Sequence, residues 1–284
     1  MSSILFTDLF RINKKGSYRF IGNPENKMLY KFIICFIAGI GAGLGTGFAG
    51  MSAAAVISPM LITFLGLPAY QAVGIALASD VLASAVSAYT YGKSKNLDIR
   101  NGSVMMVSVL CFTMIGSWVS HMVPNTAMGS MSQIMTVFLG IKFIIKPVMT
   151  TKESMAEKLS KKQRIIRSIL CGCMIGFICG FVGAGGGMMM LLVLVTVLGY
   201  ELKTAVGTSV FIMAFTAFTG SASHFLISGE ITDIPALIFC VISTLIWAIF
   251  AAKIANKASA KALNRITGLV LIIVGIITVV FKYI

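Results

Sequence analysis

Ten long apolar runs fill most of the chain, and they restrict its fold more than any other feature of the sequence. They cover residues 31–48, 51–66, 70–91, 103–122, 128–149, 165–182, 187–199, 203–227, 234–252 and 262–281. A helix that crosses a bilayer needs about 20 mostly apolar residues, and most of these runs approach that length. Backbone polar groups in lipid must bond within the protein, which favours helices. The sequence therefore predicts an all-α, polytopic integral membrane protein.

Composition and charge agree with this class. Hydrophobic residues make up 57% of the chain and charged residues only 11%, whereas soluble domains have about 25% charged residues. The net charge of +14 comes from 23 basic and nine acidic residues. Because the basic residues flank the apolar runs, we interpret them as membrane-orientation signals rather than as a nucleic-acid surface. We expect a multi-pass protein of the cell (plasma) membrane. Its expected partner is the lipid bilayer, and we expect no nucleic-acid partner.

The chain contains an internal repeat. Shifting the first half by 133 residues aligns 43–74 with 176–207 without a gap, and 11 of these 32 positions are identical. An internal duplication explains this match best. The predicted organisation is an N-terminal arm (1–30), a first transmembrane repeat (31–149), a cytoplasmic linker (150–164) and a second transmembrane repeat (165–284). The arm contains a mixture of apolar and basic residues, which is compatible with a short interfacial helix or a disordered segment.

Each repeat is predicted to contain a glycine-broken helix pair followed by three helices. The breaks lie in 41–55 and 176–190, where several glycines occur at membrane depth. An interrupted helix in lipid is tolerated only inside protein or beside a cavity. Glycines spaced four residues apart also allow helices to approach closely, and we assign that role to Gly43, Gly47, Gly176 and Gly180. The denser glycines from 183 to 187 predict a turn.

The basic loops suggest how the two halves are oriented. Basic residues cluster from Lys93 to Arg100, in the linker, and from Lys253 to Arg265, and such loops stay on the cytoplasmic side. The loop 121–128 of the first half has no Lys or Arg, so equivalent loops of the two halves differ in charge. This difference is typical of inverted-topology repeats, which we predict. The alternative of two parallel halves fits the total count of basic residues slightly better, because the inverted arrangement places the basic N-terminal arm outside.

Several duplicated motifs resemble those of a known family. They are GxGxGFAG (43–50), GFICGFVGAGGGMM (176–189), LGLPAYQAVGIAL (65–77), LGYELKTAVGTSV (198–210) and GEITD (229–233). With these motifs the chain resembles the TauE/SafE family of membrane permeases from about residue 31 to 284. The resemblance implies export of sulfite, of sulfonates such as sulfoacetate, or of another small anion. Gly207-Thr208-Ser209 fits the family's small polar pattern, whereas Gly74-Ile75-Ala76 departs from it.

The glycine breaks suggest a chemistry for anion transport. An anion entering hydrocarbon must exchange its hydration shell for hydrogen-bond donors. A broken helix supplies unpaired amides at the positive end of its dipole, and glycine lets an oxyanion approach them. Together with the substrate class that the resemblance implies, this chemistry leads us to predict a secondary transporter that works by alternating access, with a small anionic substrate and neither cofactor nor metal. The candidate substrate-binding residues are Gly50, Met51, Ser52, Gly183, Gly185, Gly186, Gly187, Thr208 and Ser209.

Asp80 is the one acid near the middle of an apolar run, and its counterpart in the second half is Met213. It is a candidate for carrying a coupling proton or cation, or else a packing residue. An ionised acid beside an anion path is unfavourable, so a proton-coupled role requires Asp80 to be protonated while the anion passes. His121 and His224, near the ends of apolar runs, are expected to be interfacial.

The cysteines, the glycines and the direction of transport each allow an alternative function. Cys171, Cys173 and Cys179 could serve an intramembrane thiol redox enzyme, but helical spacing spreads them over more than one face, and small packing residues is the simpler interpretation. The same interpretation is preferred for the methionines at 188–190. The glycines could also serve only in a membrane scaffold, and transport could be uptake rather than export. We expect no enzyme activity; a homodimer is a further possibility.

Overall fold

The computed structural model describes residues 10–12, 18–20, 24–124, 160–183, 186–228 and 233–259, with isolated residues between 127 and 141 and between 262 and 276. Within these residues, six helices are long and apolar enough to cross a membrane, and two apolar helices are shorter. The long helices are α2 (Pro24–Ala49), α4 (Ala69–Lys93), α5 (Ile99–His121), α7 (Lys161–Val182), α9 (Leu202–Ser228) and α10 (Ile234–Ala255). The short ones are α3 (Ala54–Leu65) and α8 (Gly186–Thr196).

These elements confirm the predicted all-α architecture for eight of the ten apolar runs. The other two runs, 128–149 and 262–281, lie almost entirely outside the described residues. Two boundaries differ from the prediction: α2 begins at Pro24 inside the predicted N-terminal arm, and α7 begins at Lys161 inside the predicted linker. At α7 the reason is a capping box, in which Ser160 and Gln163 bond each other's backbone amides and extend the helix beyond its apolar part.

Part of the N-terminal arm is neither the helix nor the disordered segment that we predicted. Strands β1 (Phe10–Ile12) and β2 (Tyr18–Phe20) pair antiparallel, with Arg11 opposite Arg19. Apolar and aromatic side chains alternate with arginine in both strands, and a period of two residues is the pattern of a strand. The register pairs Phe10 with Phe20 and Ile12 with Tyr18 on either side of the arginine pair.

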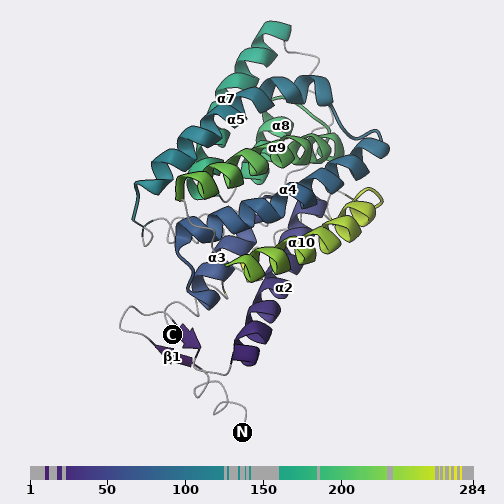
Figure 1. Cartoon of the computed structure of the whole chain (residues 1–284). Helices are drawn as coiled ribbons and strands as arrows, with labels where there is room; N and C mark the ends of the chain where they lie inside the picture. The colour runs from purple at the N-terminus through teal and green to yellow at the C-terminus, as the bar shows by residue number, and fades with distance from the viewer. Residues whose placement is uncertain are drawn as a thin grey trace.

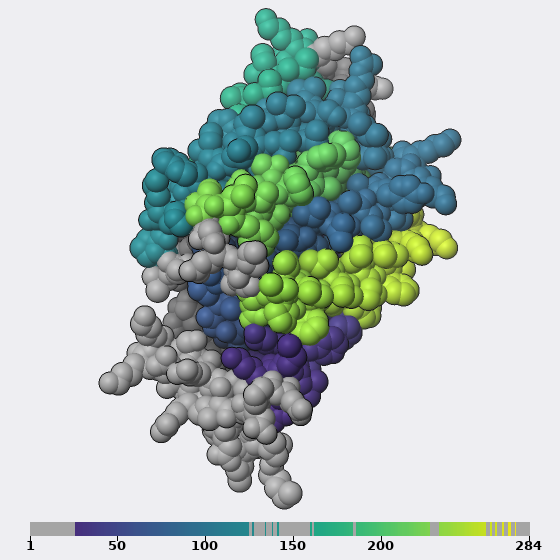
Figure 2. Space-filling view, viewed as in Figure 1, coloured from purple at the N-terminus to yellow at the C-terminus, as the bar shows by residue number. Residues whose placement is uncertain are grey.

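The six long helices pack side by side in a row. Replacing each helix by its equivalent in the other half gives the same row, read from the opposite end. Figure 1 shows α7, α5, α9, α4, α10 and α2 following one another across the molecule, with α3 and α8 behind. Figure 2 shows the same helices as adjacent bands on one face. The helices α2 and α7 are equivalent in the repeat, as are α4 and α9, and α5 and α10. Each half therefore packs its first helix against the third long helix of the other half.

Equivalent residues also make equivalent hydrogen bonds. Tyr91 donates its hydroxyl to the Gly47 carbonyl at 3.0 Å, and His224 Nε2 lies 3.1 Å from the Gly180 carbonyl. Both pairs are related by the shift of 133 residues that aligns the halves. Helices α4 and α9 run antiparallel, because Gly74 near the start of α4 lies against His224 near the end of α9. Residues that the shift of 133 positions relates thus occupy corresponding places in the helix packing.

Four glycines form the two closest helix seams, as predicted. A Cβ on Gly43 would lie 2.6 Å from the Thr244 carbonyl oxygen, and one on Gly47 would lie 2.8 Å from the Ala248 carbonyl oxygen. In the equivalent seam, a Cβ on Gly176 would lie 2.9 Å from Val109 Cα. Gly180 packs in the same way against Thr113 and Ser117. These distances are shorter than real Cβ contacts, so only glycine permits the backbones of α2 and α10, and of α7 and α5, to approach this closely.

Polar residues gather at the two ends of the helices, where the loops lie. At one end the Asn96 side chain bonds Asn256 at 3.1 Å and Lys203 Nζ bonds the Asn256 carbonyl at 2.9 Å, joining the α4–α5 loop to the ends of α9 and α10. At the opposite end Lys31 forms an ion pair with Asp233. Between residues 26 and 259, among the basic residues whose side chains the structure describes, the first end carries far more than the second. They are Lys93, Lys95, Arg100, Lys162, Arg164, Arg167, Lys203, Lys253 and Lys257, against Lys27 and Lys31.

Candidate functional site

The first break separates α2 from α3 over residues 50–53. Gly50 has a φ of +61°, a left-handed conformation that ends α2 and that glycine adopts without a Cβ penalty. The Gly50 amide bonds the Thr46 carbonyl at 3.0 Å, and the Met51 amide bonds the Gly45 carbonyl at 3.3 Å. Thr46 donates its hydroxyl to the Met51 carbonyl at 2.8 Å. The break is therefore a defined turn inside the protein.

The second break separates α7 from α8 at the equivalent position. Gly183 has a φ of +71°, and its amide bonds the Cys179 carbonyl at 2.9 Å. The next helix begins at Gly186, while Gly185 lies outside the described residues. The first amides of α8, from Gly186 and Gly187, have no carbonyl one turn earlier in their helix to bond. Both predicted interruptions are thus real, and each starts with a left-handed glycine.

The two breaks lie against each other. Ser52 donates its hydroxyl to the Gly183 carbonyl across a long 3.4 Å hydrogen bond. A Cβ on Gly187 would strike the Gly50 carbonyl and lie 2.8 Å from the Ser52 amide nitrogen. Because backbone atoms form this contact, a flexible side chain cannot move aside to relieve it. The fold therefore brings together predicted site residues that are more than 130 positions apart in the chain.

Asp80 of α4 faces the first break and is completely buried. Ser84, one turn later on α4, donates its hydroxyl to Asp80 Oδ1 at 2.7 Å. Thr46, Ser52 and the Ala53 amide are close enough to interact with the carboxyl group. Oδ2 has no partner at hydrogen-bond distance among the described residues. The predicted coupling residue therefore belongs to the same cluster as the predicted substrate residues.

The two hydroxyls predicted on α9 occupy different places. Ser209 lies against Gly50, and it donates its hydroxyl to the Val206 carbonyl at 2.8 Å. Thr208 accepts the Asp98 amide at 3.1 Å and thus lies at the α4–α5 loop. The geometry brings Ser209 to the first break and does not bring Thr208 to either break.

Most amides of the first break are already bonded. Gly50 and Met51 donate within the turn, and the Ala54 amide donates to Ser52 Oγ at 3.3 Å. In this conformation these amides cannot donate to an anion unless those hydrogen bonds break. The start of α8 and the Ser52 region are where an incoming anion would find main-chain donors, at the positive end of a helix.

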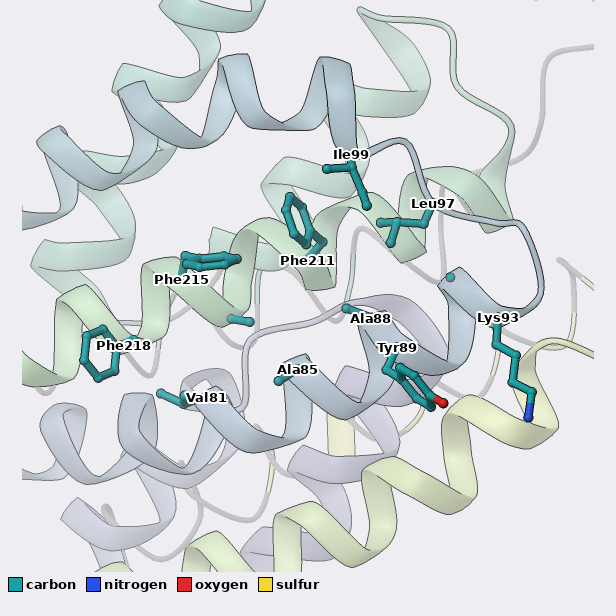
Figure 3. A pocket seen from close by; sticks show the side chains of 12 residues that line it. Val81, Ala85, Ala88, Tyr89, Lys93, Leu97, Ile99, Phe211, Phe215 and Phe218 are labelled. Atoms are coloured by element: carbon teal, nitrogen blue, oxygen red, sulfur yellow. The ribbon is translucent and has the colours of Figure 1, made fainter.

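A large groove elsewhere is a poor candidate for anions. About 830 Å³ in volume, it lies between α4 and α9 beside the start of α5. Figure 3 shows Phe211, Phe215 and Phe218 along α9, facing Val81 and Ala85 of α4. Phe218 is 63% exposed, as suits a side chain that contacts lipid. Tyr89 and Lys93 are its polar lining residues, so it offers an anion little to bind.

The cysteines do not form a common site. Cys173 lines a shallow apolar pocket with Phe112 and Phe177, whereas Cys179 is fully buried against Gly186. All six cysteines are free, and the described residues contain no cluster of His, Cys, Asp or Glu that could hold a metal ion. Met188 and Met190 are buried in the core, as a packing role requires.

One histidine was placed wrongly from the sequence. We predicted an interfacial His224, but it is only 1% exposed, and its ring is tilted against the Tyr70 ring with the two centroids 4.1 Å apart. The equivalence of His224 to Tyr91 is the signal that could have identified its buried position, since both residues contact a glycine carbonyl of a broken helix. Thr46 and Ser84 were also not predicted as site residues; the spacing of four residues between Asp80 and Ser84 on one helix face indicates their contact.

These features define a polytopic helical membrane protein with two interrupted helices meeting in its core. Residues 35–278 match the model of the family described as "Sulfite exporter TauE/SafE". This match covers most of the chain, so the protein belongs to the TauE/SafE family, which is a family of membrane transporters and not of enzymes.

Two relatives illustrate the breadth of this similarity. The "Probable membrane transporter protein YunE" of Bacillus subtilis is 25% identical over 86% of this chain and 96% of its own length. A "Probable membrane transporter protein" of Methanocaldococcus jannaschii is also 25% identical, over 86% of this chain and 92% of its own. The similarity therefore extends over nearly the full length of both relatives.

Proposed function

We propose that this protein is a secondary transporter of a small oxyanion, such as sulfite or an organosulfonate, with its binding site where the two breaks meet. The contact of Gly187 with Gly50 and Ser52 is the observation that carries the proposal. It joins the positive end of α8 to a polar turn in the interior, within a chain whose described Lys and Arg residues are all outside the buried core. A site of amides and hydroxyls binds an anion weakly enough to release it.

The substrate class and the direction rest on the family. Its description names sulfite export, and we propose efflux of such an anion across the plasma membrane by alternating access. The predicted homodimer is kept as a hypothesis that cross-linking in native membranes would test.

We further propose that the halves are inverted repeats. The antiparallel packing of α4 against α9 supports this, because equivalent helices run in opposite directions only when the symmetry axis lies in the membrane plane. The basic end of the helices, where Lys93, Arg164 and Lys257 lie, would then face the cytoplasm, and Lys31 would lie outside.

Flux measurements test the proposed site. Gly187→Ala adds a methyl group where the two breaks touch, and we expect sulfite and methanesulfonate flux into proteoliposomes to fall at least tenfold. Gly92→Ala is the matched control, because its Cβ would meet only the flexible Leu97 side chain, at 3.1 Å. We expect Gly92→Ala to keep most of the wild-type flux.

The proposal fails if Gly187→Ala elutes and unfolds like the wild-type protein and transports both anions at the same rate. A second substitution, Ser52→Ala, checks the same place without adding volume. Its flux should fall as well, since it removes a hydroxyl that links the two breaks.

A further inference from the structure

We infer that Asp80, Thr46 and Ser52 form a proton site, and that one proton crosses the membrane with each monovalent anion. This inference rests on the proposed transport function and adds its coupling ion. It starts from the completely buried Asp80 carboxyl, which faces the first break. Within the described residues no Lys or Arg is buried, so the carboxylate has no positive partner in the core.

The hydroxyls around Asp80 differ in what they offer it. Ser84 gives its hydrogen to Oδ1 at 2.7 Å. The hydrogens of Thr46 and Ser52 go instead to the Met51 carbonyl at 2.8 Å and the Gly183 carbonyl at 3.4 Å. Each hydroxyl has one hydrogen and two lone pairs, so Thr46 and Ser52 offer lone pairs to the carboxyl group. Oδ2 has no hydrogen-bond partner among the described residues, so a hydrogen there would turn toward these two hydroxyls, which lie close enough to interact with the carboxyl group.

The same cluster also suits the ionised carboxylate. Ser84 donates to it, and the Ala53 amide at the start of α3 is within range to donate as well. The positive end of the α3 dipole adds a favourable field. A coupling group must exist in both forms during one transport cycle, and this cluster has donors for the ionised form and acceptors for the protonated form.

A proton fits this cluster better than a metal cation. The Ala53 amide and the Ser84 hydroxyl point hydrogens at the carboxyl group, and a metal ion would be repelled by them. Asp80 is the one acid in the cluster, whereas cations such as Ca²⁺ and Mg²⁺ take six or more oxygen ligands. Transport that requires Na⁺ would overturn the assignment of this cluster to a proton.

In the part of the chain that the structure describes, no other ionisable group competes closely with Asp80. From α7, the thiol of Cys179 lies close enough to interact with its charge. The buried faces of α3, α8 and α10 carry no acid, His, Lys or Arg among the described residues, and Cys240 of α10 lies against Cys35 instead. His224 of α9 lies beside Gly74 near the start of α4, away from the middle where Asp80 lies.

The position of Asp80 links the proton to the anion. Ser52 contacts both Asp80 and the second break, so the two charges would be separated by one residue. A bound anion beside an ionised carboxylate is repelled in a low dielectric, and protonation removes that repulsion. Each cycle then moves one anion and one proton in the same direction with no net charge, and the anion and pH gradients together set that direction.

The test uses the full chain in proteoliposomes with methanesulfonate, a monovalent anion that stays ionised and cannot carry a proton itself. For the wild type, we expect a pH gradient to drive its uptake, its entry to acidify the lumen, and an imposed membrane potential to have no effect on its accumulation. For Asp80→Asn we expect uptake without acidification, and an accumulation ratio that changes about 50-fold per 100 mV, because a single charge then moves. Ser79→Ala, which loses only a bond within α4, should behave like the wild type.

Three results would overturn the proton site: voltage-driven wild-type flux without acidification, an Asp80→Asn protein that still couples to pH, or flux that requires Na⁺. Should Asp80→Asn fail to fold, Asp80→Met replaces it, since the equivalent residue Met213 is buried in the second half.

A transport-independent measurement separates this inference from the proposed function. If the wild type moves no anion at all, the proposed function fails and infrared difference spectra of the purified protein still decide the proton site. A pH-dependent carboxylic acid band that is present in wild type and Ser79→Ala but absent in Asp80→Asn supports it. The absence of such a band in wild type overturns it.

Discussion

Asp98 shows how one side chain fixes the end of a helix and the neighbouring loop. Its carboxylate accepts the Asn101 amide at 3.1 Å as the N-cap of α5, and it accepts the Tyr200 hydroxyl at 2.9 Å. Partial burial alone would raise the pKa of Asp98, but the hydrogen bonds from Asn101 and Tyr200 hold that pKa below its usual value. Burial, together with the Asp98 charge, raises the pKa of Tyr200. The fold therefore stabilises the ionised carboxylate.

We expect Asp98→Ala to lower the stability of the purified protein by about 1 kcal/mol at neutral pH, the usual cost of losing an N-cap. A carboxylate with a lowered pKa stabilises the fold above the unfolded-state pKa, and this contribution disappears as the pH falls below about 4. The difference between wild type and Asp98→Ala in thermal unfolding should therefore narrow on acidification. A difference that grows as the pH falls would contradict this role.

Which polar residues matter was only partly predictable from the sequence. Asp80 stood out because an acid in the middle of an apolar run is rare and costly. Thr46 and Ser52 could not be assigned to it, because their contacts depend on how α2 and α3 fold back beside α4. The error at His224 has a similar cause. Its position near the end of an apolar run suggested an interfacial residue, and its contact with the Gly180 carbonyl depends on helix packing that the sequence does not give.

At the scale of elements, the seams of α2 with α10 and of α7 with α5 depend on glycine. Gly180→Val should destabilise the α7–α5 seam by about 1 to 3 kcal/mol, because its side chain would overlap the backbone of Thr113 and Ser117. Thermal unfolding in detergent measures this loss, with Gly92→Ala as the tolerated control. Equal unfolding temperatures for the two variants would show that the seam is looser than described.

The breaks illustrate what the sequence can say about elements. Dense glycines at membrane depth predicted both interruptions, since glycine alone takes left-handed φ at Gly50 and Gly183 without strain. Their mutual contact could not be predicted, because it depends on the tilt of helices that are far apart in the chain. The β1–β2 pair was missed because three-residue strands give too few alternations to be distinguished from an amphipathic arm.

At the scale of the whole molecule, sidedness distinguishes the inverted from the parallel arrangement. In the inverted arrangement Ser94 and Lys257 lie on one side and Met122, which is 63% exposed, lies on the other. Two parallel halves would place Ser94 and Lys257 on opposite sides. We expect impermeant thiol reagents added to intact cells to label Met122→Cys and to label neither Ser94→Cys nor Lys257→Cys.

Inside-out vesicles provide the complementary measurement for the same variants. There the labelling should reverse, with Ser94→Cys and Lys257→Cys reactive and Met122→Cys protected. Labelling of Ser94→Cys and Lys257→Cys from opposite faces would contradict the inverted arrangement. The wild-type protein, whose cysteines lie within the membrane-spanning helices, is the control for background reaction.

The central claim is that the transported anion passes between the two breaks, and cysteine protection at Ser52 tests it most directly. In a Cys179→Ala background, we predict that Ser52→Cys reacts with a small water-soluble thiol reagent during turnover and that methanesulfonate slows this reaction in proportion to its occupancy. Cys35, buried against Cys240 away from the breaks, should show no protection. A Ser52→Cys thiol that reacts at the same rate with and without the anion, in a protein that still transports it, would contradict the account.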